Sequence, residues 1–307
     1  MSISLIRHHA AFWLLLAAFA CLAVPRANAQ TDDEVISIDS SVVLANIYIT
    51  DRNGQPVGGL EQKLFTILED GVPQRIESFS AESTPFAAVI LIDTSGSMEL
   101  RMSNARSAAI KFLEGMRGTD LAAVAGFDND VRVLRDFAAT HDLPDVFFDL
   151  KADGMTSLND AVVKAAKMLA ARPEKRRAII VISDGADNSS KYSQKKALQA
   201  ALDVGASVYT VDMSPKDAPM AEKAAMQNAL KSFASKTGGT FVATPGGAEM
   251  RDAFEAIVAE LGNQYTISYQ PAISKQDGKF HTIEVRVARG GLTIRTRQGY
   301  IAPKRKD

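Results

Sequence analysis

Short apolar runs that alternate with amphipathic stretches between residues 84 and 262 constrain the fold of this chain most strongly. Each run has the length of a buried strand, and the stretches between the runs carry apolar residues at helical spacing, as at Met102, Ala105 and Ala109. Strands that alternate with helices in this way predict a mostly parallel sheet with helices on both faces. The six runs are 86–92, 121–127, 131–134, 178–182, 208–211 and 240–243.

The third run places one strand at an edge of this sheet. Residues 131–134 follow the second run too closely for a crossover helix, so we predict that this strand is antiparallel to its predecessor. The expected fold class is therefore α/β, with a doubly wound, mostly parallel, six-stranded sheet of the Rossmann-like order 3-2-1-4-5-6 over residues 84–262.

The two ends of the chain follow a different, period-two pattern that is typical of strands. Alternating apolar residues share one face over 43–49, and a hairpin is predicted from 64–68 and 74–79. Three further strands are expected after residue 263. Since each flank has too few strands to fold alone, we predict that segment 37–82 pairs with segment 263–302 in one small, discontinuous β domain.

The first 29 residues have the pattern of a secretory signal peptide. Arg7 precedes an apolar run at 10–20, and the small residues Ala27 and Ala29 mark a cleavage site. The run is shorter than the ~20 residues that span a bilayer, and no later segment is long and apolar enough. We therefore predict an exported chain, periplasmic or secreted, without a membrane span after signal cleavage. Retention of the segment as an anchor is the alternative.

Composition narrows the classes of function. The chain is 46% apolar and 23% charged, as expected of a globular protein. Its 35 basic and 36 acidic residues nearly balance, which gives no reason to expect a nucleic acid partner. The single cysteine, Cys21, lies in the predicted signal peptide, so disulfides and cysteine chemistry are excluded from the mature chain.

Acidic residues follow the first and fourth strands of the predicted sheet. Asp93 comes directly after the first apolar run, and Asp184 follows the fourth. In the predicted order these strands are neighbours whose carboxyl ends meet where the winding reverses, so the two carboxylates should lie side by side. Two such carboxylates need a positive neighbour. Neither motif contains a basic residue, but Ser95 and Ser97 offer hydroxyl oxygens, and oxygen ligands favour Mg²⁺, with Mn²⁺ or Ca²⁺ as alternatives.

The stretch Asp93-Thr94-Ser95-Gly96-Ser97 resembles the DxSxS signature of von Willebrand factor type A domains, such as the inserted domains of integrins. The resemblance implies a metal-ion-dependent adhesion site. The third element of that site is a threonine in a Gly-rich turn, which Thr156 matches, although Met155 stands where the family usually has a second glycine. The flanks resemble secreted bacterial proteins related to this family, of the Acidobacteria type. The implied metal ligands are Asp93, Ser95, Ser97, Thr156 and Asp184.

A site of this composition suits binding better than catalysis. Its two carboxylates balance a divalent ion, while Mg²⁺ takes about six oxygen ligands, so one position stays open. We expect a Glu or Asp side chain of a protein partner to complete the coordination, in adhesion or complex assembly. The residues expected to rim the open position are Thr94, Met98, Met155 and Asp187.

Three other functions compete with this prediction. A Mg²⁺-dependent phosphotransferase of the haloacid-dehalogenase type needs a second acid two residues after Asp93, where Ser95 stands. A serine hydrolase needs a base, and only His141 and His281 remain in the mature chain, with no G-x-S-x-G motif. In the third competing function, the protein is a scaffold, and its bound ion only stabilises the loops. We therefore predict a protein that is not an enzyme, with an unidentified partner.

Overall fold

The computed structural model describes residues 42–81, 84–215, 219–243, 247–272 and 277–304. All of these fall in the unit Ser37–Asp307, and the predicted signal peptide, residues 1–29, lies outside them. Within the described ranges, no helix is both long enough and apolar enough to cross a membrane.

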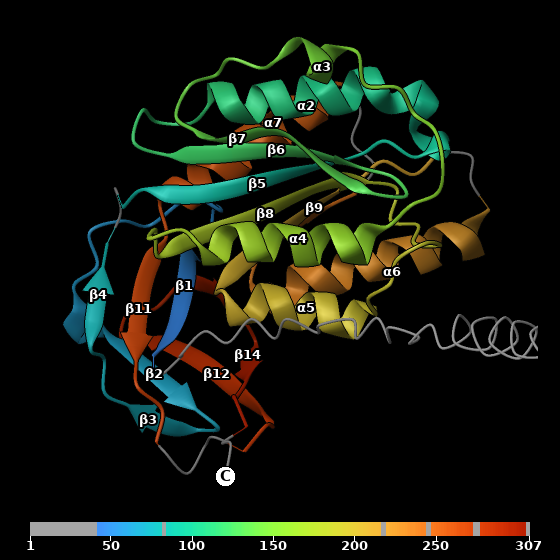
Figure 1. Ribbon diagram of the computed structural model, residues 1–307. Helices are drawn as coiled ribbons and strands as arrows, with labels where there is room; N and C mark the ends of the chain where they lie inside the picture. The colour runs from blue at the N-terminus through green and yellow to red at the C-terminus, as the bar shows by residue number, and fades with distance from the viewer. Residues whose placement is uncertain (1–41, 82–83, 216–218, 244–246, 273–276, 305–307) are drawn as a thin grey trace, which may run out of the picture. The chain divides into compact units, whose positions relative to one another are not determined.

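A six-stranded sheet forms the centre of the α/β region (Figure 1). Its strands lie in the order β10-β9-β8-β5-β6-β7, and all neighbours are parallel except β6 and β7. Numbered along the chain, this is the order 3-2-1-4-5-6, so the predicted fold class and the antiparallel edge strand are confirmed. The strands are β5 (Phe86–Asp93), β6 (Leu121–Phe127), β7 (Val131–Ala138), β8 (Arg176–Ser183), β9 (Ala206–Asp212) and β10 (Phe241–Val242).

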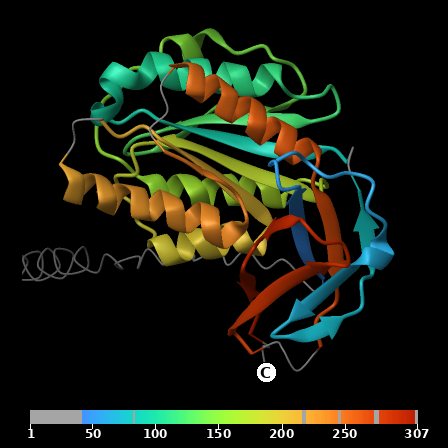
Figure 2. The ribbon, with the colours of Figure 1, turned by 180° about the vertical axis from the view of Figure 1, so that it is seen from behind.

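Helices cover both faces of this sheet, as Figures 1 and 2 show. Because successive side chains of a strand point to opposite faces, Ile90 of β5 packs in one core and Leu91 in the other. The central strands are therefore buried on both sides. The helices on the face of Ile90 are α2 (Met102–Glu114), the short α3 (Asp145–Phe148) and α7 (Gly247–Gly262), and those on the face of Leu91 are α4 (Leu158–Ala170), α5 (Gln194–Asp203) and α6 (Met220–Thr237).

The flanks build two further sheets, and each contains strands from both flanks. One sheet has the order β13-β1-β11-β4 and the other has the order β14-β12-β2-β3. They share one core, in which Ile47, Ile67 and Tyr265 are completely buried. The predicted pairing of the two flanks is thus found. The strands are β1 (Val43–Thr50), β2 (Phe65–Glu69), β3 (Val72–Gln74), β4 (Ser78–Ser80), β11 (Tyr265–Tyr269), β12 (Phe280–Val287), β13 (Thr293–Thr296) and β14 (Gly299–Ile301).

Two features of these sheets differ from the prediction. The expected return strand 74–79 is two strands, because β3 pairs with β2 while β4 pairs with β11 in the other sheet. The turn between β2 and β3 consists only of Asp70 and Gly71, both with positive φ (49° and 80°), so the return begins at Val72. The short strand β14 has no counterpart among the predicted strands.

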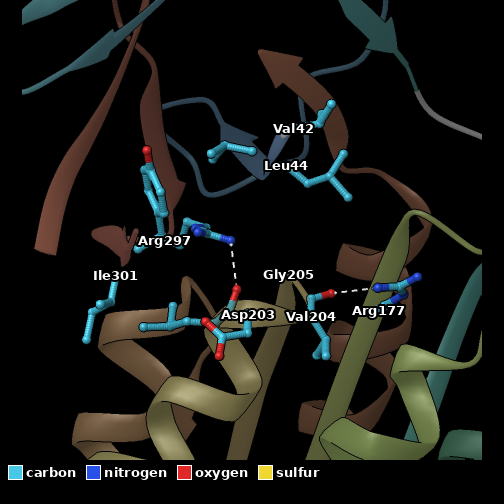
Figure 3. Close-up of a pocket in the computed structure, with 11 residues that line it drawn as sticks. Val42, Leu44, Arg177, Asp203, Val204, Gly205, Arg297 and Ile301 are labelled. Atoms are coloured by element: carbon cyan, nitrogen blue, oxygen red, sulfur yellow. Dashed lines mark hydrogen bonds between the residues drawn. The ribbon is translucent and has the colours of Figure 1, made fainter. Parts of the chain in front are cut away.

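The β sheets attach to the α/β region at the amino ends of the central strands. Arg176, the first residue of β8, is completely buried and donates to the carbonyl of Ala81 (2.7 Å) and to the hydroxyl of Thr266 (3.2 Å). A cavity of about 240 Å³ lies where the β sheets meet the α/β region (Figure 3), and there Arg297 donates to the carbonyl of Leu202 (3.1 Å). The carboxyl ends of the central strands lie at the opposite end of the sheet (Figure 1).

Candidate metal site

Two buried carboxylates follow neighbouring strands at the carboxyl edge of the central sheet. Asp93 is the last residue of β5, and Asp184 comes directly after β8. The two strands pair in parallel with Ile92 opposite Ile182, so both acids reach the same edge. Neither acid is more than 2% exposed. The observed strand order therefore brings two ionisable groups out of water at the place where the winding of the sheet reverses.

The electrostatics of Asp93 reflect this burial. Loss of solvent raises the pKa of Asp93 to about 6. Hydrogen bonds from Ser183 and Ser95 lower the pKa: the hydroxyl of Ser183 donates to Oδ2 (2.6 Å), and Ser95 contributes through its side chain and through its N–H, which donates to Oδ1 (2.9 Å). The charge of Asp184 raises the pKa further, because neighbouring negative charges disfavour ionisation. A cation at this edge would offset both the free-energy cost of burying the charge of Asp93 and its repulsion from Asp184.

The loop after β5 places its two serine hydroxyls together. Ser95 is buried and Ser97 is exposed, and their Oγ atoms lie 3.2 Å apart. Ser97 belongs to the short 3₁₀ helix η2 (Gly96–Arg101), which begins directly after Ser95. The N–H of Gly96 donates to the carbonyl of Gly154 (3.2 Å), so this loop contacts the loop that carries Thr156.

The loop before α4 is held by hydrogen bonds on two sides. The N–H of Thr156, a buried residue, donates to Oδ1 of Asn188 (2.8 Å), and the N–H of Asn188 donates back to the Thr156 carbonyl (3.0 Å). On the other side, the N–H of Met155 donates to Oδ1 of Asn129 (2.9 Å). Since Asn188 and Asp184 share the loop after β8, these bonds link all three loops that carry predicted ligands.

The structure therefore places the five predicted ligands on three mutually bonded loops at one edge of the sheet. Their donor set of two carboxylates and three hydroxyls fits a hard divalent ion such as Mg²⁺. Coordination of one ion by all five side chains stays a prediction. The five residues are Asp93, Ser95, Ser97, Thr156 and Asp184.

Two of the four predicted rim residues are wrong. Met98 is completely buried in the core beneath α2, because the 3₁₀ turn of η2 directs its side chain inward. Thr94 is also buried, and its hydroxyl donates to Asp128 (3.0 Å). Met155 is 47% exposed, which is compatible with a rim position.

The fourth predicted rim residue, Asp187, is exposed, but its carboxylate is already engaged. Oδ2 accepts the N–H of Asn159 (2.9 Å) in the first turn of α4, and Oδ1 accepts the N–H of Ser190 (3.2 Å). Asp187 therefore holds the start of α4 against the loop after β8. Among the four predicted rim residues, Met155 is therefore the one whose side chain is exposed and is not engaged in hydrogen bonds that hold the loops.

The sequence pattern alone does not single out Ser183 and Asn188 as parts of this site. Ser183 orients Asp93 through its hydroxyl, and Asn188 fixes the backbone of Thr156. One feature of the sequence could have indicated Ser183: it is a hydroxyl residue at the end of a buried strand, directly before the predicted ligand Asp184. Asn188 directly follows the predicted rim residue Asp187, which makes it a candidate for this loop, but its partner Thr156 lies 32 residues away in the sequence.

Replacing Ser183 with alanine is expected to weaken Mg²⁺ binding by roughly 10- to 100-fold, the usual effect of losing a residue that orients a metal ligand. The variant removes the hydrogen bond to Asp93 Oδ2 and leaves all five predicted ligands in place. Titration calorimetry measures the affinity. Ser207→Ala is the matched control, because Ser207 is buried at the opposite, amino end of β9. Equal affinities for the two variants would contradict the assigned role.

Comparisons with known proteins show what the α/β region is similar to. Residues 88–186 match the family model of the von Willebrand factor type A domain. No curated protein matches the sequence. The solved von Willebrand factor type A structure from Catenulispora acidiphila is 14% identical, with a TM-score of 0.50 over 84% of this chain and 74% of that chain. The vWF domain of the type V pili tip protein Mfa5 from Porphyromonas gingivalis is 15% identical, with a TM-score of 0.47 over 59% and 95%. At 14% identity, the Catenulispora acidiphila structure shows a shared fold alone.

Proposed function

Since the chain contains a von Willebrand factor type A domain, we propose that it is an exported, non-enzymatic protein that binds Mg²⁺ and, through the ion, a carboxylate of a protein partner. The buried pair Asp93 and Asp184 is the observation that supports this proposal most directly. Within the described ranges, no lysine or arginine forms an ion pair with either acid. A divalent ion supplies the charge that this pair lacks.

An open coordination position accounts for partner binding. Mg²⁺ takes about six oxygen ligands, and this site offers five side chains. A sixth oxygen has to approach from solvent, and Ser97 and Met155 are among the exposed residues of the two loops that contact each other there. A Glu or Asp carboxylate is the protein side chain that best fits such a position, because it adds both an oxygen ligand and a negative charge.

Two further features support export and a binding role. The signal-peptide pattern over residues 1–29 supports export to the periplasm or the medium. The position two residues after Asp93 is Ser95, whose N–H donates to Asp93 (2.9 Å). A Mg²⁺-dependent phosphotransferase of the type considered above would have its second acid at this position. The site therefore lacks the group that would move a proton in that chemistry.

Asp93→Ala is expected to abolish Mg²⁺ binding in titration calorimetry and to abolish capture of the partner from the native envelope. The variant removes one of the two charges that hold the ion. Chelation by EDTA should have the same effect on the wild-type chain, and added Mg²⁺ should restore capture. Asp252→Ala is the matched control, because it removes an exposed carboxylate on α7 and should change neither measurement.

Two outcomes would contradict the proposal in different ways. Capture that resists EDTA would show that the ion does not take part in partner binding. A lower melting temperature of Asp93→Ala with unchanged capture would show that the ion only ties the loops together, which is the scaffold function considered above.

A further inference from the structure

The β2–β3 turn and the start of β12 bring three metal-ligating side chains together. They are Glu69, Asp70 and His281, and one ligand atom from each lies within 4.8 Å of the other two. Glu69 ends β2, Asp70 opens the two-residue turn, and His281 is the second residue of β12. Strands β2 and β12 are antiparallel neighbours, with Glu69 opposite Ile283, so the sheet itself sets these positions.

His281 is only 4% exposed, and aspartates hold both of its ring nitrogens. Nδ1 lies 2.8 Å from Asp70 Oδ2, and Nε2 lies 3.1 Å from Asp277 Oδ1. Asp70 is fixed in turn, because its Oδ1 accepts the N–H of Thr282 (2.9 Å). A carboxylate on the distal ring nitrogen is the arrangement that orients a histidine toward a metal ion.

Glu69 is a buried carboxylate, only 1% exposed. The hydroxyl of Tyr300 donates to its Oε2 (3.1 Å). Burial raises the pKa of the Tyr269 hydroxyl, and the neighbouring carboxylate of Glu69 raises it further, so Tyr269 also lies against this carboxylate. Arg297 lies over the Tyr300 ring and donates to backbone carbonyls. Across the described segments, no lysine or arginine forms an ion pair with Glu69.

We propose that Glu69, Asp70 and His281 form a second metal site that takes a transition-metal ion such as Zn²⁺, with Asp277 orienting the histidine. Two carboxylates balance the charge of a divalent ion. The imidazole nitrogen favours Zn²⁺ over Mg²⁺ and distinguishes this cluster from the all-oxygen set at Asp93. Three protein ligands leave the fourth tetrahedral position for water, on the side where Asp70 is exposed. The ion replaces any proton held between His281 Nδ1 and Asp70.

The same contacts also suit a protonated His281 that bridges Asp70 and Asp277 without an ion. The two states differ in their response to metal. A bridging imidazolium gains nothing from Zn²⁺, whereas the proposed site binds it and releases protons.

Titration of the full-length chain with Co²⁺, in Mg²⁺ that saturates the first site, tests the proposal. We expect a single equivalent to give the visible absorption of a nitrogen-containing, four-coordinate site, and Zn²⁺ to displace it. His281→Gln and Asp70→Asn should each lower the Co²⁺ affinity more than 100-fold, whereas Asp277→Asn should lower it by roughly 10- to 100-fold. His141→Gln, which changes an exposed histidine, is the matched control and should bind as the wild type does.

Absorption that persists in His281→Gln, or its absence from the wild-type chain, would overturn the proposal. If His281→Gln does not fold, the near-isosteric Asp70→Asn decides: unchanged Co²⁺ affinity overturns the proposal, and a hundredfold loss supports it. Asp93→Ala should retain the Co²⁺ signal, because it alters only the first site. The failure of one site is therefore distinguishable from the failure of the other.

Discussion

Replacing Gly185 with alanine is expected to lower the free energy of unfolding by about 3 kcal/mol, from a left-handed backbone penalty combined with a steric clash. Gly185 has a φ of +87° directly after Asp184. An added Cβ would lie 2.6 Å from the carbonyl oxygen of Met226 and 3.0 Å from Cγ of Leu230, both in α6. Since the first of these atoms belongs to a helix backbone, the loop that carries Asp184 has to move.

Urea denaturation of the variant and the wild type measures this loss, and calorimetry should show weaker Mg²⁺ binding as well. Gly118→Ala is the matched control, because a Cβ at Gly118 would meet no atom within 4 Å. We expect the control to stay within about 0.5 kcal/mol of the wild type, as most surface substitutions do. Similar losses in both variants would mean that close packing at Gly185 does not limit the stability of this edge.

The metal-free chain is expected to lose up to about 3 kcal/mol of stability as the pH rises from about 4 to 7, through Asp93 alone. The pKa of Asp93 is about 6 in the folded chain, chiefly because of burial, against an ordinary value of 3.8. The folded state therefore binds this proton more tightly than the unfolded state does. The stabilising contribution is complete below pH 3.8 and is lost as the pH rises through 6.

Thermal melts of wild-type chain and Asp93→Asn in EDTA, at a series of pH values, isolate this contribution. The asparagine variant should lack it, so the difference between the two curves should change between about pH 4 and 6, the interval that the folded and ordinary pKa values of Asp93 define. Mg²⁺ should raise the melting temperature of the wild type more at pH 7 than at pH 4.5, because it binds the ionised carboxylate. Asp252→Asn serves as the control. Parallel curves for wild type and Asp93→Asn would contradict the expected effect.

The central sheet is predictable because strands that are buried on both faces appear as unbroken apolar runs. Strand β5 is apolar from Phe86 to Ile92 and then changes abruptly to Asp93, which reveals both the strand and its polar end. The short interval before β7 excludes a crossover helix and therefore predicts the antiparallel edge. Once the order of the strands is set, the meeting of Asp93 with Asp184 at one edge follows from topology alone.

The details of the loops and flanks depend on contacts that a local pattern does not contain. The position of Met98 beside a ligand motif suggests exposure, but the 3₁₀ turn that follows Ser95 rotates this side chain into the core. Between β3 and β4 the chain crosses from one sheet to the other. Alternating apolar residues cannot reveal this crossing, since both sheets pack their apolar faces into one core. Asn188 likewise depends on a partner in another loop.

The pairing of the two flanks affects the order in which the chain can fold. Strand β1 pairs with β11 and β13, so its hydrogen-bonding edges find their partners only after most of the polypeptide has been synthesised. Such distant pairing slows folding, because a long loop must close first. The inserted α/β region can shorten that loop by folding early and holding its own two ends together. A chain that loses its final strands would leave the earliest strands with exposed edges, which are prone to aggregation.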